Sequence, residues 1–336
     1  MNNRLDGTRM KGPAVSVVVC CYNAEETVAS TLESLQKQSF TDFEIVAIDD
    51  GSSDNTVGQL GDFAAVEPRL RVLQNPSNRG TAFTHQRGLE EARGQFVMFV
   101  DADDIAEPAL LSRLFDTITA DPDLIGVGCF ATYFTDEGAD LGLQRVGPRS
   151  CAEFNRMYRD AKLMFMVPVT MFRKRDALAV GGYRQGIMPN DHSIRYEDFS
   201  EDLDLWCRMS DLGAEGRYFV TIPEPLFRYR KPTGSLSTNN LKLMQLKMRW
   251  IKDCLRRRRA GQPERDLAKF IASRGLFERF ADWRSDHAAA FYKRAAFAYA
   301  QRSFLRLVWY LTLTGMISPK LIRQKIATQT VARSKV

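Results

Sequence analysis

The sequence predicts an α/β protein with a mostly parallel sheet that is flanked by helices and followed by a helical C-terminal region. Short apolar runs alternate with helical patterns through the first part of the chain, which is typical of βαβ units whose sheet is covered on both faces. From about residue 241 onward the pattern is nearly all helical and basic. Polar clusters follow the apolar runs, at the strand ends beyond which such sheets bind ligands.

The first part of the chain alternates strands and helices in order. The predicted strands are buried apolar runs, at 14–19, 44–48, 70–73 and 96–100. The predicted helices carry apolar residues three and four apart, through Val28, Leu32 and Leu35, then over 84–92 and over 108–120. Polar clusters at 22–23, 49–50 and 101–103 each follow a strand, so we expect them to meet at one edge of the sheet.

The pattern is less regular after residue 125. The elements predicted there are strands at 126–133 and 165–172, a turn at 181–183, a helix over 203–212 and a closing strand at 225–230. Two longer helices are predicted beyond them, over 241–259 and 291–313.

The composition excludes several classes of protein. Of the 336 residues, 44% are hydrophobic and 26% are charged, which excludes disordered, collagen-like and multi-span membrane proteins. The net charge of +6 reflects Lys and Arg residues that gather late in the chain, most densely at 256–259. Such a segment can bind nucleic acid or anionic lipid, or it can form a solvated helix face.

The cysteines and the N-terminal residues predict a cytoplasmic protein. None of the six cysteines belongs to a C-x-x-C pair, and several lie in apolar runs, as reduced and buried thiols do. The first residues are polar and lack the apolar core of a signal peptide. The longest apolar stretch, 307–317, is shorter than the roughly 20 residues that cross a bilayer. We therefore expect neither secretion nor a spanning helix.

Three carboxylates after the fourth predicted strand predict a cation site. Asp101, Asp103 and Asp104 follow one another closely, and buried carboxylates are costly unless a positive charge balances them. In an extended segment Asp101 and Asp103 point to the same side and can bind one divalent ion. Because no His or Cys lies beside them, Mg²⁺ or Mn²⁺ is favoured over Zn²⁺. The alternative is an acidic turn that caps the next helix.

Two further polar clusters are candidates for nucleotide contacts at the same edge. The run DDGSSD at 49–54 offers acceptors for a base or a ribose, although a capped βα turn explains it equally well. The turn NRG at 78–80 can bring backbone N–H groups and the Arg79 guanidinium to phosphate oxygens, and a plain turn is its alternative.

Together these motifs resemble those of the family 2 glycosyltransferases, which share the GT-A nucleotide-diphospho-sugar transferase fold. The resemblance runs from about Ala14 to Leu236. Six segments carry it, in the family's order and spacing: VSVVVCCYNAEETVASTLESLQKQSF, EIVAIDDGSSDNT, NPSNRGTA, GQFVMFVDADD, VGGYR and EDLDLW. The six together are far more specific than any one of them alone.

The resemblance implies a donor pocket and a bound metal ion. The positions implied for the nucleobase and ribose pocket are Tyr22, Glu25, Asp49 and Asp50. Asp101 and Asp103 match the family's D-x-D pair, with Asp103 the more direct ligand of Mn²⁺ or Mg²⁺ and Asp101 nearer the ribose. A metal ion there would stabilise the departing nucleoside diphosphate as a Lewis acid.

The resemblance also implies a catalytic base in the acidic pair Glu201-Asp202, just ahead of a helix. Asp202 would take the proton of the acceptor hydroxyl, and crowding by other acids would raise its pKa toward the range that suits a base. A second Glu-Asp pair at 197–198 leaves Asp198 as an alternative base. For either pair, an ordinary helix N-terminus is the structural alternative. Direct displacement with one base inverts the anomeric centre, as the family implies.

Basic residues are expected near the diphosphate. The family often has an Arg where this chain has His85, so His85 or Arg87 would have to take its place, unless His85 is an ordinary solvated residue. Arg228 or Arg230 in the closing strand would reach the diphosphate when the following segment closes and excludes water. A solvated edge strand is the alternative for that segment.

We expect four parts along the chain. They are an N-terminal tail at 1–13, a nucleotide-sugar-binding half at 14–125, an acceptor and catalytic-base half at 126–238 and a basic helical region at 239–336. The aromatic and basic residues of the last part suit peripheral contact with anionic lipid. Packing on the catalytic domain or on a second copy in a homo-oligomer is the alternative.

The function implied is inverting, metal-dependent transfer of a sugar from a nucleoside diphosphate sugar, most commonly a UDP sugar, to an acceptor hydroxyl. Family analogy suggests an acceptor in cell-surface polysaccharide or glycolipid synthesis. A sugar-nucleotide pyrophosphorylase and a dinucleotide-binding oxidoreductase are less favoured, because the first strand is not followed by a Gly-rich phosphate loop. A non-catalytic nucleotide-sugar-binding protein remains an alternative. Nucleic-acid binding is not expected, since the basic residues cluster away from the acidic edge.

Overall fold

The computed structural model describes residues 12–188, 194–231, 240–300, 303–319 and 322. Its contacts divide the chain into two compact units, which are considered separately. The first unit consists of Met1–Ser235 together with Met248–Glu264, and the second of Leu236–Lys247 together with Arg265–Val336. The functional boundary expected between residues 125 and 126 stays a prediction.

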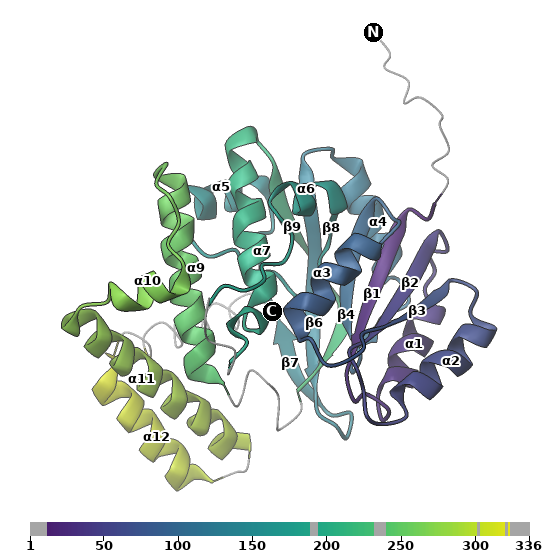
Figure 1. Ribbon diagram of the computed structural model, residues 1–336. Helices are drawn as coiled ribbons and strands as arrows, with labels where there is room; N and C mark the ends of the chain where they lie inside the picture. Colours follow the sequence, from purple (N-terminus) through teal and green to yellow (C-terminus); the bar gives the residue numbers. More distant parts are fainter. Residues whose placement is uncertain (1–11, 189–193, 232–239, 301–302, 320–321, 323–336) are drawn as a thin grey trace. The chain divides into compact units, whose positions relative to one another are not determined.

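The first unit is an α/β structure (Figure 1). Its strands are β1 Val15–Cys21, β2 Phe43–Asp49, β3 Leu70–Gln74, β4 Phe96–Asp101, β5 Ile105–Ala106, β6 Leu124–Phe134, β7 Asp140–Gln144, β8 Met171–Arg173 and β9 Tyr218–Arg230. Its helices up to residue 215 are α1 Val28–Gln36, α2 Thr56–Val66, α3 Thr81–Glu91, α4 Leu110–Ala120, α5 Cys151–Arg159, α6 Lys174–Ala179 and α7 Glu201–Met209, with 3₁₀ turns at Tyr196–Asp198 and Ser210–Glu215.

One sheet organises this unit, in the strand order β3-β2-β1-β4-β8-β6-β9-β5, with β7 paired to β6. The first four strands pair in parallel. Strand β8 is antiparallel to both of its neighbours, β4 and β6, whereas β6 and β9 are again parallel. The sheet is therefore mostly parallel at the end that carries the predicted donor-binding loops, as the sequence predicted.

The continuous apolar runs arise because both faces of the sheet are covered. Val17 and Val19 of β1 join a core with residues of α1, α2 and α4. Val18 points to the other face, where the backbone of α3 approaches it at Gly88. Side chains alternate across a strand, so a strand buried on both faces needs apolar residues at every position.

The expected strand at 165–172 is wrong over most of its length. Only Met171–Arg173 pairs, as β8. Most of the preceding residues from 166 onward are buried, and Val167 and Val169 are fully inaccessible to solvent. Pro168 has no N–H to give to a ladder, and the Thr170 hydroxyl donates to the Val167 carbonyl at 2.7 Å, which closes a local turn.

Four further helices are described beyond residue 240: α9 Leu241–Arg259, α10 Leu267–Ala272, α11 Leu276–Ala300 and α12 Phe304–Ile317. The bounds predicted for α9 are confirmed, but the single helix expected over 291–313 is wrong. The chain forms two helices there, and α11 begins at Leu276. The Ser303 N–H donates to the Ala298 carbonyl at 2.8 Å, which marks the end of α11.

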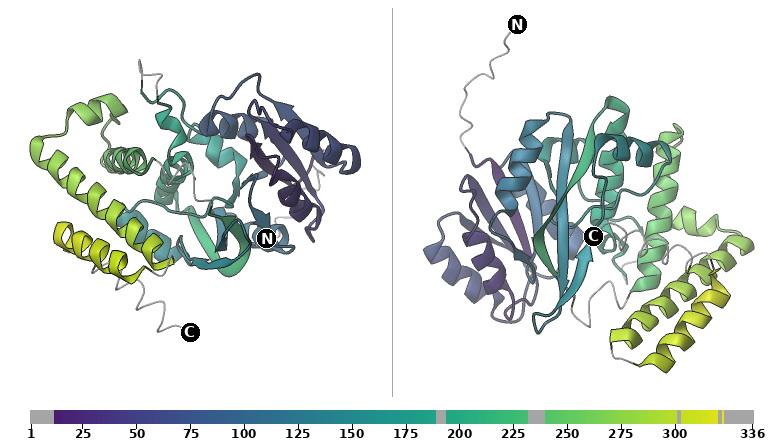
Figure 2. Two further views of the ribbon diagram at one scale, coloured as in Figure 1. Left: turned by 90° about the horizontal axis from the view of Figure 1, so that it is seen from below. Right: turned by 180° about the vertical axis from the view of Figure 1, so that it is seen from behind.

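Helices α11 and α12 pack against each other as a hairpin, and Figure 2 shows them side by side in both views. Phe291 of α11 and Tyr310 of α12 face each other with their ring centroids 6.3 Å apart. Among the helices in the described part of the chain, none is both long enough and apolar enough to span a bilayer.

Two helical glycines test how closely α3 packs on the sheet. A Cβ at Gly88 would lie 2.5 Å from Val18 Cγ1, whereas a Cβ at Gly61 of α2 would meet nothing within 4 Å. We expect Gly88→Ala to lower the free energy of unfolding by about 1–3 kcal/mol through overpacking. The control Gly61→Ala should raise it by about 0.5–1 kcal/mol, because alanine favours the helix. Urea denaturation measures both, and a stabilised Gly88→Ala variant would contradict this packing.

Candidate active site

The sheet register brings the predicted donor-binding loops together at the carboxyl end of β1. Cys20 pairs with Asp101 of β4, and Cys21 pairs with Asp49 of β2. Because β1 lies between these two strands, the loops that follow all three strands begin at one edge. The expected meeting of the three polar clusters is therefore confirmed.

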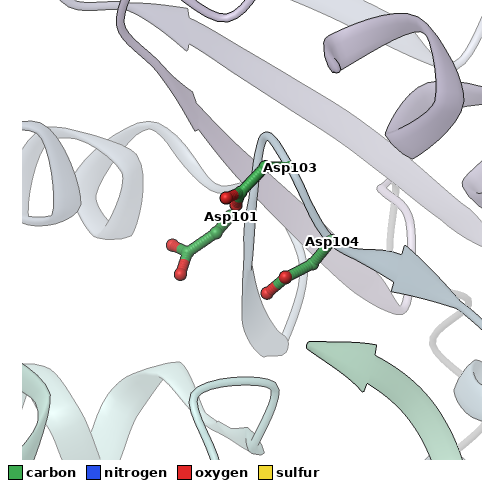
Figure 3. Close-up of side chains that lie close together, drawn as sticks. All are labelled: Asp101, Asp103 and Asp104. Atoms are coloured by element: carbon green, nitrogen blue, oxygen red, sulfur yellow. The ribbon is translucent and has the colours of Figure 1, made fainter. Parts of the chain in front are cut away.

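The carboxylates after β4 lie in a tight turn at 101–104, the acid turn. The Asp104 N–H donates to the Asp101 carbonyl at 3.1 Å, so the extended geometry expected for this segment is wrong. This turn brings the Asp104 carboxylate close to those of Asp101 and Asp103. Carboxylate oxygens of Asp101, Asp103 and Asp104 all lie within 4.8 Å of one another, and Figure 3 shows the three side chains directed to the same side of the turn.

These three carboxyl groups resist ionisation because they are withdrawn from water and close together. Burial, together with the nearby charges of Asp103 and Asp202, raises the pKa of Asp101 to about 7. Burial also raises the pKa of Asp103 and holds that of Asp104 well above its usual range. Among the described residues, the buried Asp104 Oδ2 has no hydrogen-bond partner.

Two basic residues at the end of β9 face this turn. The Arg230 N–H donates to Asp104 Oδ1 at 2.7 Å, and its Nε donates to the Asp103 carbonyl at 2.9 Å. Lys231 lies with its Nζ 4.3 Å from the ring centroid of Tyr229, and its charge opposes the rise in pKa of the three carboxyl groups. Sequence reasoning found Arg230 but missed Lys231, because no motif marks it.

Asp50, which was expected in the nucleotide pocket, holds the loop between β3 and α3 in place. It is 5% exposed, and its two carboxylate oxygens accept from the backbone N–H groups of Arg79 and Gly80 at 2.9 and 2.8 Å. The side chain of Asn75 donates to it as well. Asp49 beside it caps its own turn, accepting from the Gly51 N–H at 3.1 Å.

The loop after β1 is tied to the loop after β2. The Asn23 N–H donates to Ser52 Oγ at 2.9 Å, and the Glu25 carboxylate accepts from the Asn55 N–H at 2.8 Å. Tyr22 stands in the same loop with 51% of its surface exposed. An exposed aromatic ring at this edge can stack on a nucleobase, whereas Glu25 braces the two loops.

Helix α7 brings the predicted base to the acid turn. Asp202 lies in its first turn and is near enough to Asp101 to raise the pKa of that carboxyl group. Burial raises the pKa of the Tyr183 hydroxyl, and the nearby charge of Asp202 raises it further. Tyr183 belongs to the VGGYR segment, which the sequence assigned to a turn without a role at the site.

The rival acid, Asp198, is engaged elsewhere. Its Oδ1 accepts from the Ala82 N–H at 2.9 Å, at the N-terminus of α3, and its Oδ2 pairs with Arg195 Nε at 3.0 Å. A carboxylate at this position satisfies an N–H group that has no partner within the helix. Asp198 is thus an anchor between the 196–198 turn and α3.

His85 is buried, so the solvated surface residue considered as its alternative is wrong. The side chain lies between Phe99 and Tyr183, with ring centroids 4.6 and 5.0 Å away. Burial lowers the pKa of His85 to about 4, so the ring is neutral near pH 7. Its Nδ1 lies 3.7 Å from a carboxylate oxygen of Glu201. Arg87, the other candidate at this position, donates to the carbonyl of Gln74 at 2.7 Å.

Two of the expected phosphate-binding arginines have other partners. The Arg79 guanidinium lies 4.0 Å from the ring centroid of Phe83 and is exposed. Arg228 pairs with Asp140 at 3.0 Å and lies over the ring of Phe134. Of the arginines expected near the diphosphate, Arg230 is the one with a recorded contact to the acid turn.

A network of ion pairs fixes the position of α7. Arg208 pairs with Asp204 at 2.9 Å and donates to the carbonyl of Gly182 at 2.6 Å. Arg184 also pairs with Asp204, at 3.2 Å, and with Glu264 at 2.6 Å. These contacts join α7 to the VGGYR segment and to the end of the first unit, which limits how far Asp202 can move.

A family model described as glycosyl transferase family 2 matches residues 16–181. Residues 16–181, about half of the chain, belong to glycosyltransferase family 2. The matched region runs from β1 to the VGGYR segment and contains the loops after β1, β2 and β4 that meet at the acid turn.

Curated relatives match this chain over part of their length. EpsH of Bacillus subtilis is 34% identical over 132 residues, which cover 39% of this chain and 38% of EpsH. An uncharacterized glycosyltransferase of Haemophilus influenzae is 25% identical over 223 residues, which cover 65% of each chain. The matched part of the chain therefore spans less than two thirds of these two relatives.

Solved structures support the GT-A fold. The mannosyltransferase PcManGT from Pyrobaculum calidifontis, in complex with GDP-Man and Mn²⁺, has a TM-score of 0.52 at 18% identity, covering 91% of this chain and 86% of its own. TarS 1–349 from S. aureus, in complex with UDP, has a TM-score of 0.51 at 17% identity, covering 87% and 88%. The predicted α/β fold with a mostly parallel sheet and a helical C-terminal region is confirmed.

The acid turn should make stability depend on pH. Because the pKa of Asp101 is raised to about 7 in the folded protein, the folded state keeps a proton that the unfolded state loses near pH 4. Stability without metal should therefore fall as the pH rises from about 4 to 7. Asp101→Asn should raise the free energy of unfolding at pH 8 by about 1–3 kcal/mol, with a smaller gain toward pH 4.

Denaturation in EDTA at several pH values measures this effect. The exposed Asp62 of α2 provides the control Asp62→Asn, which should show no such gain. An Asp101→Asn variant as stable as the wild type at pH 8 would show that the carboxylate is not under strain.

Proposed function

We propose that the protein transfers a sugar from a nucleoside diphosphate sugar to an acceptor hydroxyl, with inversion and with the help of a divalent cation. The observation that carries this proposal is the meeting of the Asp101, Asp103 and Asp104 carboxylates, within 4.8 Å of one another, with Asp202 of α7. A cation and a base beside each other are what such a displacement needs.

The acid turn fits a hard divalent cation. Its ligands are carboxylate oxygens, which Mg²⁺ and Mn²⁺ prefer. The raised pKa values of Asp101 and Asp103 support a site that favours a bound positive charge. A bound ion would stabilise the negative charge of the departing diphosphate as a Lewis acid. Asp103 and Asp101 are the ligands we propose, and the buried, unpartnered Asp104 Oδ2 is a third candidate.

Asp202 is the base we propose for the acceptor hydroxyl. Its rival Asp198 is occupied by the Ala82 N–H and by Arg195, and the anchoring of α7 through Arg208 holds Asp202 in place. We propose that Glu201 supports this site through its contact with the buried, neutral ring of His85, whose Nδ1 lies 3.7 Å from a Glu201 carboxylate oxygen.

A UDP sugar is the first donor to test, and Tyr22, Glu25 and Asp49 are its proposed contacts at the nucleoside end. TarS has been solved with UDP and PcManGT with GDP-Man and Mn²⁺, which supports a panel of both nucleotides. We propose a saccharide or lipid-linked saccharide of the cell surface as the acceptor. All six cysteines are free thiols, which supports a reducing compartment such as the cytoplasm.

Asp202→Asn should abolish turnover without abolishing donor binding. Asparagine keeps the shape of the side chain but cannot accept the proton, so release of UDP from its sugar should fall at least about 100-fold. The affinity for UDP and Mn²⁺ should change by no more than about twofold, since the loss affects the chemical step. Turnover is measured as UDP release from a panel of UDP sugars.

Asp198→Asn provides the matched control for this variant. It should reduce stability through the α3 contact and should retain far more turnover than Asp202→Asn when both proteins are folded. Full UDP release by Asp202→Asn would refute the assignment of the base. Absence of UDP release by the wild type with every donor tested would favour the non-catalytic alternative.

Asp103→Ala should remove metal-dependent binding of the nucleotide. In the wild type, UDP and Mn²⁺ together should raise the melting temperature by about 5 °C when they are near 100 times their dissociation constant. That rise should disappear in Asp103→Ala. The control is Asp136→Ala, because Asp136 also pairs with Arg230 but is 53% exposed. An unchanged rise in Asp103→Ala would exclude this residue as the metal ligand.

A further inference from the structure

The hairpin of α11 and α12 exposes far more large apolar side chains than the rest of the described chain. Nine of the fifteen exposed large hydrophobic residues among the described positions lie in it, namely Leu276, Phe277, Phe280, Trp283, Phe304, Leu305, Val308, Trp309 and Met316. Scattered exposed residues need no explanation, but a patch of this kind marks an interaction surface.

The exposed residues of α12 form one face of that helix. Phe304, Val308, Leu305 and Trp309 follow the spacing of three and four residues that places side chains on one side. Their exposed fractions run from 62% to 88%. Thr314, by contrast, is fully buried, so the helix has an inner face and an apolar outer face.

In α11 the aromatic and acidic residues occupy different faces. Phe280 stacks on Trp283 with ring centroids 5.8 Å apart. The acids Glu278, Asp282 and Asp286 recur every four residues, which places them on one stripe away from the aromatic pair. Arg274 pairs with two of them, at 2.8 Å for Asp282 and at 3.3 Å for Glu278. The negative charge is therefore segregated from the aromatic face and partly neutralised.

Positive charge predominates in this segment. Between residues 265 and 319, the described positions hold eight Lys and Arg residues against four Asp and Glu residues. Arg279, Arg284, Arg294 and Arg306 are exposed, and Arg306 is the one charged residue of α12. Exposed aromatic residues with arginines beside them are the composition that binds the interface of an anionic bilayer.

We propose that the α11–α12 hairpin is a peripheral membrane-binding surface whose ligand is a bilayer of anionic phospholipid. The hairpin lies in the interface and does not span it, because the 14 residues of α12 are fewer than the roughly 20 needed to cross. Symmetric pairing of two copies through the same face is less favoured, since it would bring like charges such as Arg306 of both copies together. The inference stands independently of the proposed sugar transfer.

The four tryptophans allow a direct test on the full chain. Trp206 and Trp250 are 1% and 2% exposed, whereas Trp283 and Trp309 of the hairpin are 50% and 62% exposed. Vesicles of equal parts phosphatidylcholine and phosphatidylglycerol should shift the tryptophan emission to the blue and should sediment with the protein. Vesicles of phosphatidylcholine alone should do so much less, and added NaCl should weaken the binding.

Substitutions separate the apolar and the ionic contributions. The double variant Trp283→Gln with Trp309→Gln should lose the emission shift and bind the mixed vesicles about tenfold more weakly. Arg306→Glu should also weaken binding about tenfold, because it replaces a favourable charge by an unfavourable one. The control Val66→Gln removes an apolar residue of α2 that is 71% exposed, and it should bind as the wild type does.

Two results would overturn the proposal. One is equal binding of the mixed vesicles by the tryptophan double variant and the wild type. The other is a protein that ignores vesicles and forms a dimer in solution that Trp309→Gln dissociates, which would assign the surface to a second copy. Stabilisation by UDP and Mn²⁺ should be unchanged in the hairpin variants, so the outcome is distinguishable from failure of the proposed transferase function.

Discussion

Repulsion among the carboxylates that follow β4 is the constraint around which the candidate active site is built. Strand pairing holds Asp101 beside Cys20, and the tight turn leaves Asp103 and Asp104 no room to separate. Isolated buried charges of one sign are costly. Arg230 and Lys231 relieve part of the cost, yet the pKa values of all three carboxyl groups stay raised. The proposed divalent cation would supply the positive charge that these carboxyl groups lack.

Other polar residues of the same edge serve as braces that keep the site in shape. Asp50 holds the backbone at Arg79 and Gly80, and Asp198 holds the start of α3 at Ala82. Each carboxylate satisfies backbone N–H groups that would otherwise be buried without partners. The acids at this edge therefore divide into two groups. Some hold the scaffold together, whereas in the acid turn Asp104 Oδ2 has no hydrogen-bond partner among the described residues.

The second unit differs from the first in the kind of surface that its helices expose. Its hairpin hides one side of each helix by mutual packing, as Phe291 and Tyr310 show, and leaves a broad apolar side uncovered. A soluble helix normally turns a polar face outward, and α12 does not. An enzyme that modifies lipid-linked saccharides would gain from such a surface, because binding to a bilayer concentrates the enzyme where its acceptor lies.

The sequence by itself determined the order of the strands through β4, the edge at which the polar loops meet, and the cluster of acids that follows β4. These follow from the period of apolar residues and from the fixed geometry of parallel strands, both of which are local. Tertiary structure alone decided that Asp198 caps α3, that His85 is buried between Phe99 and Tyr183, and that 166–170 is largely buried without being a strand. Each depends on contacts between segments far apart in sequence, and an apolar or acidic residue looks the same in a sequence whichever partner the fold gives it.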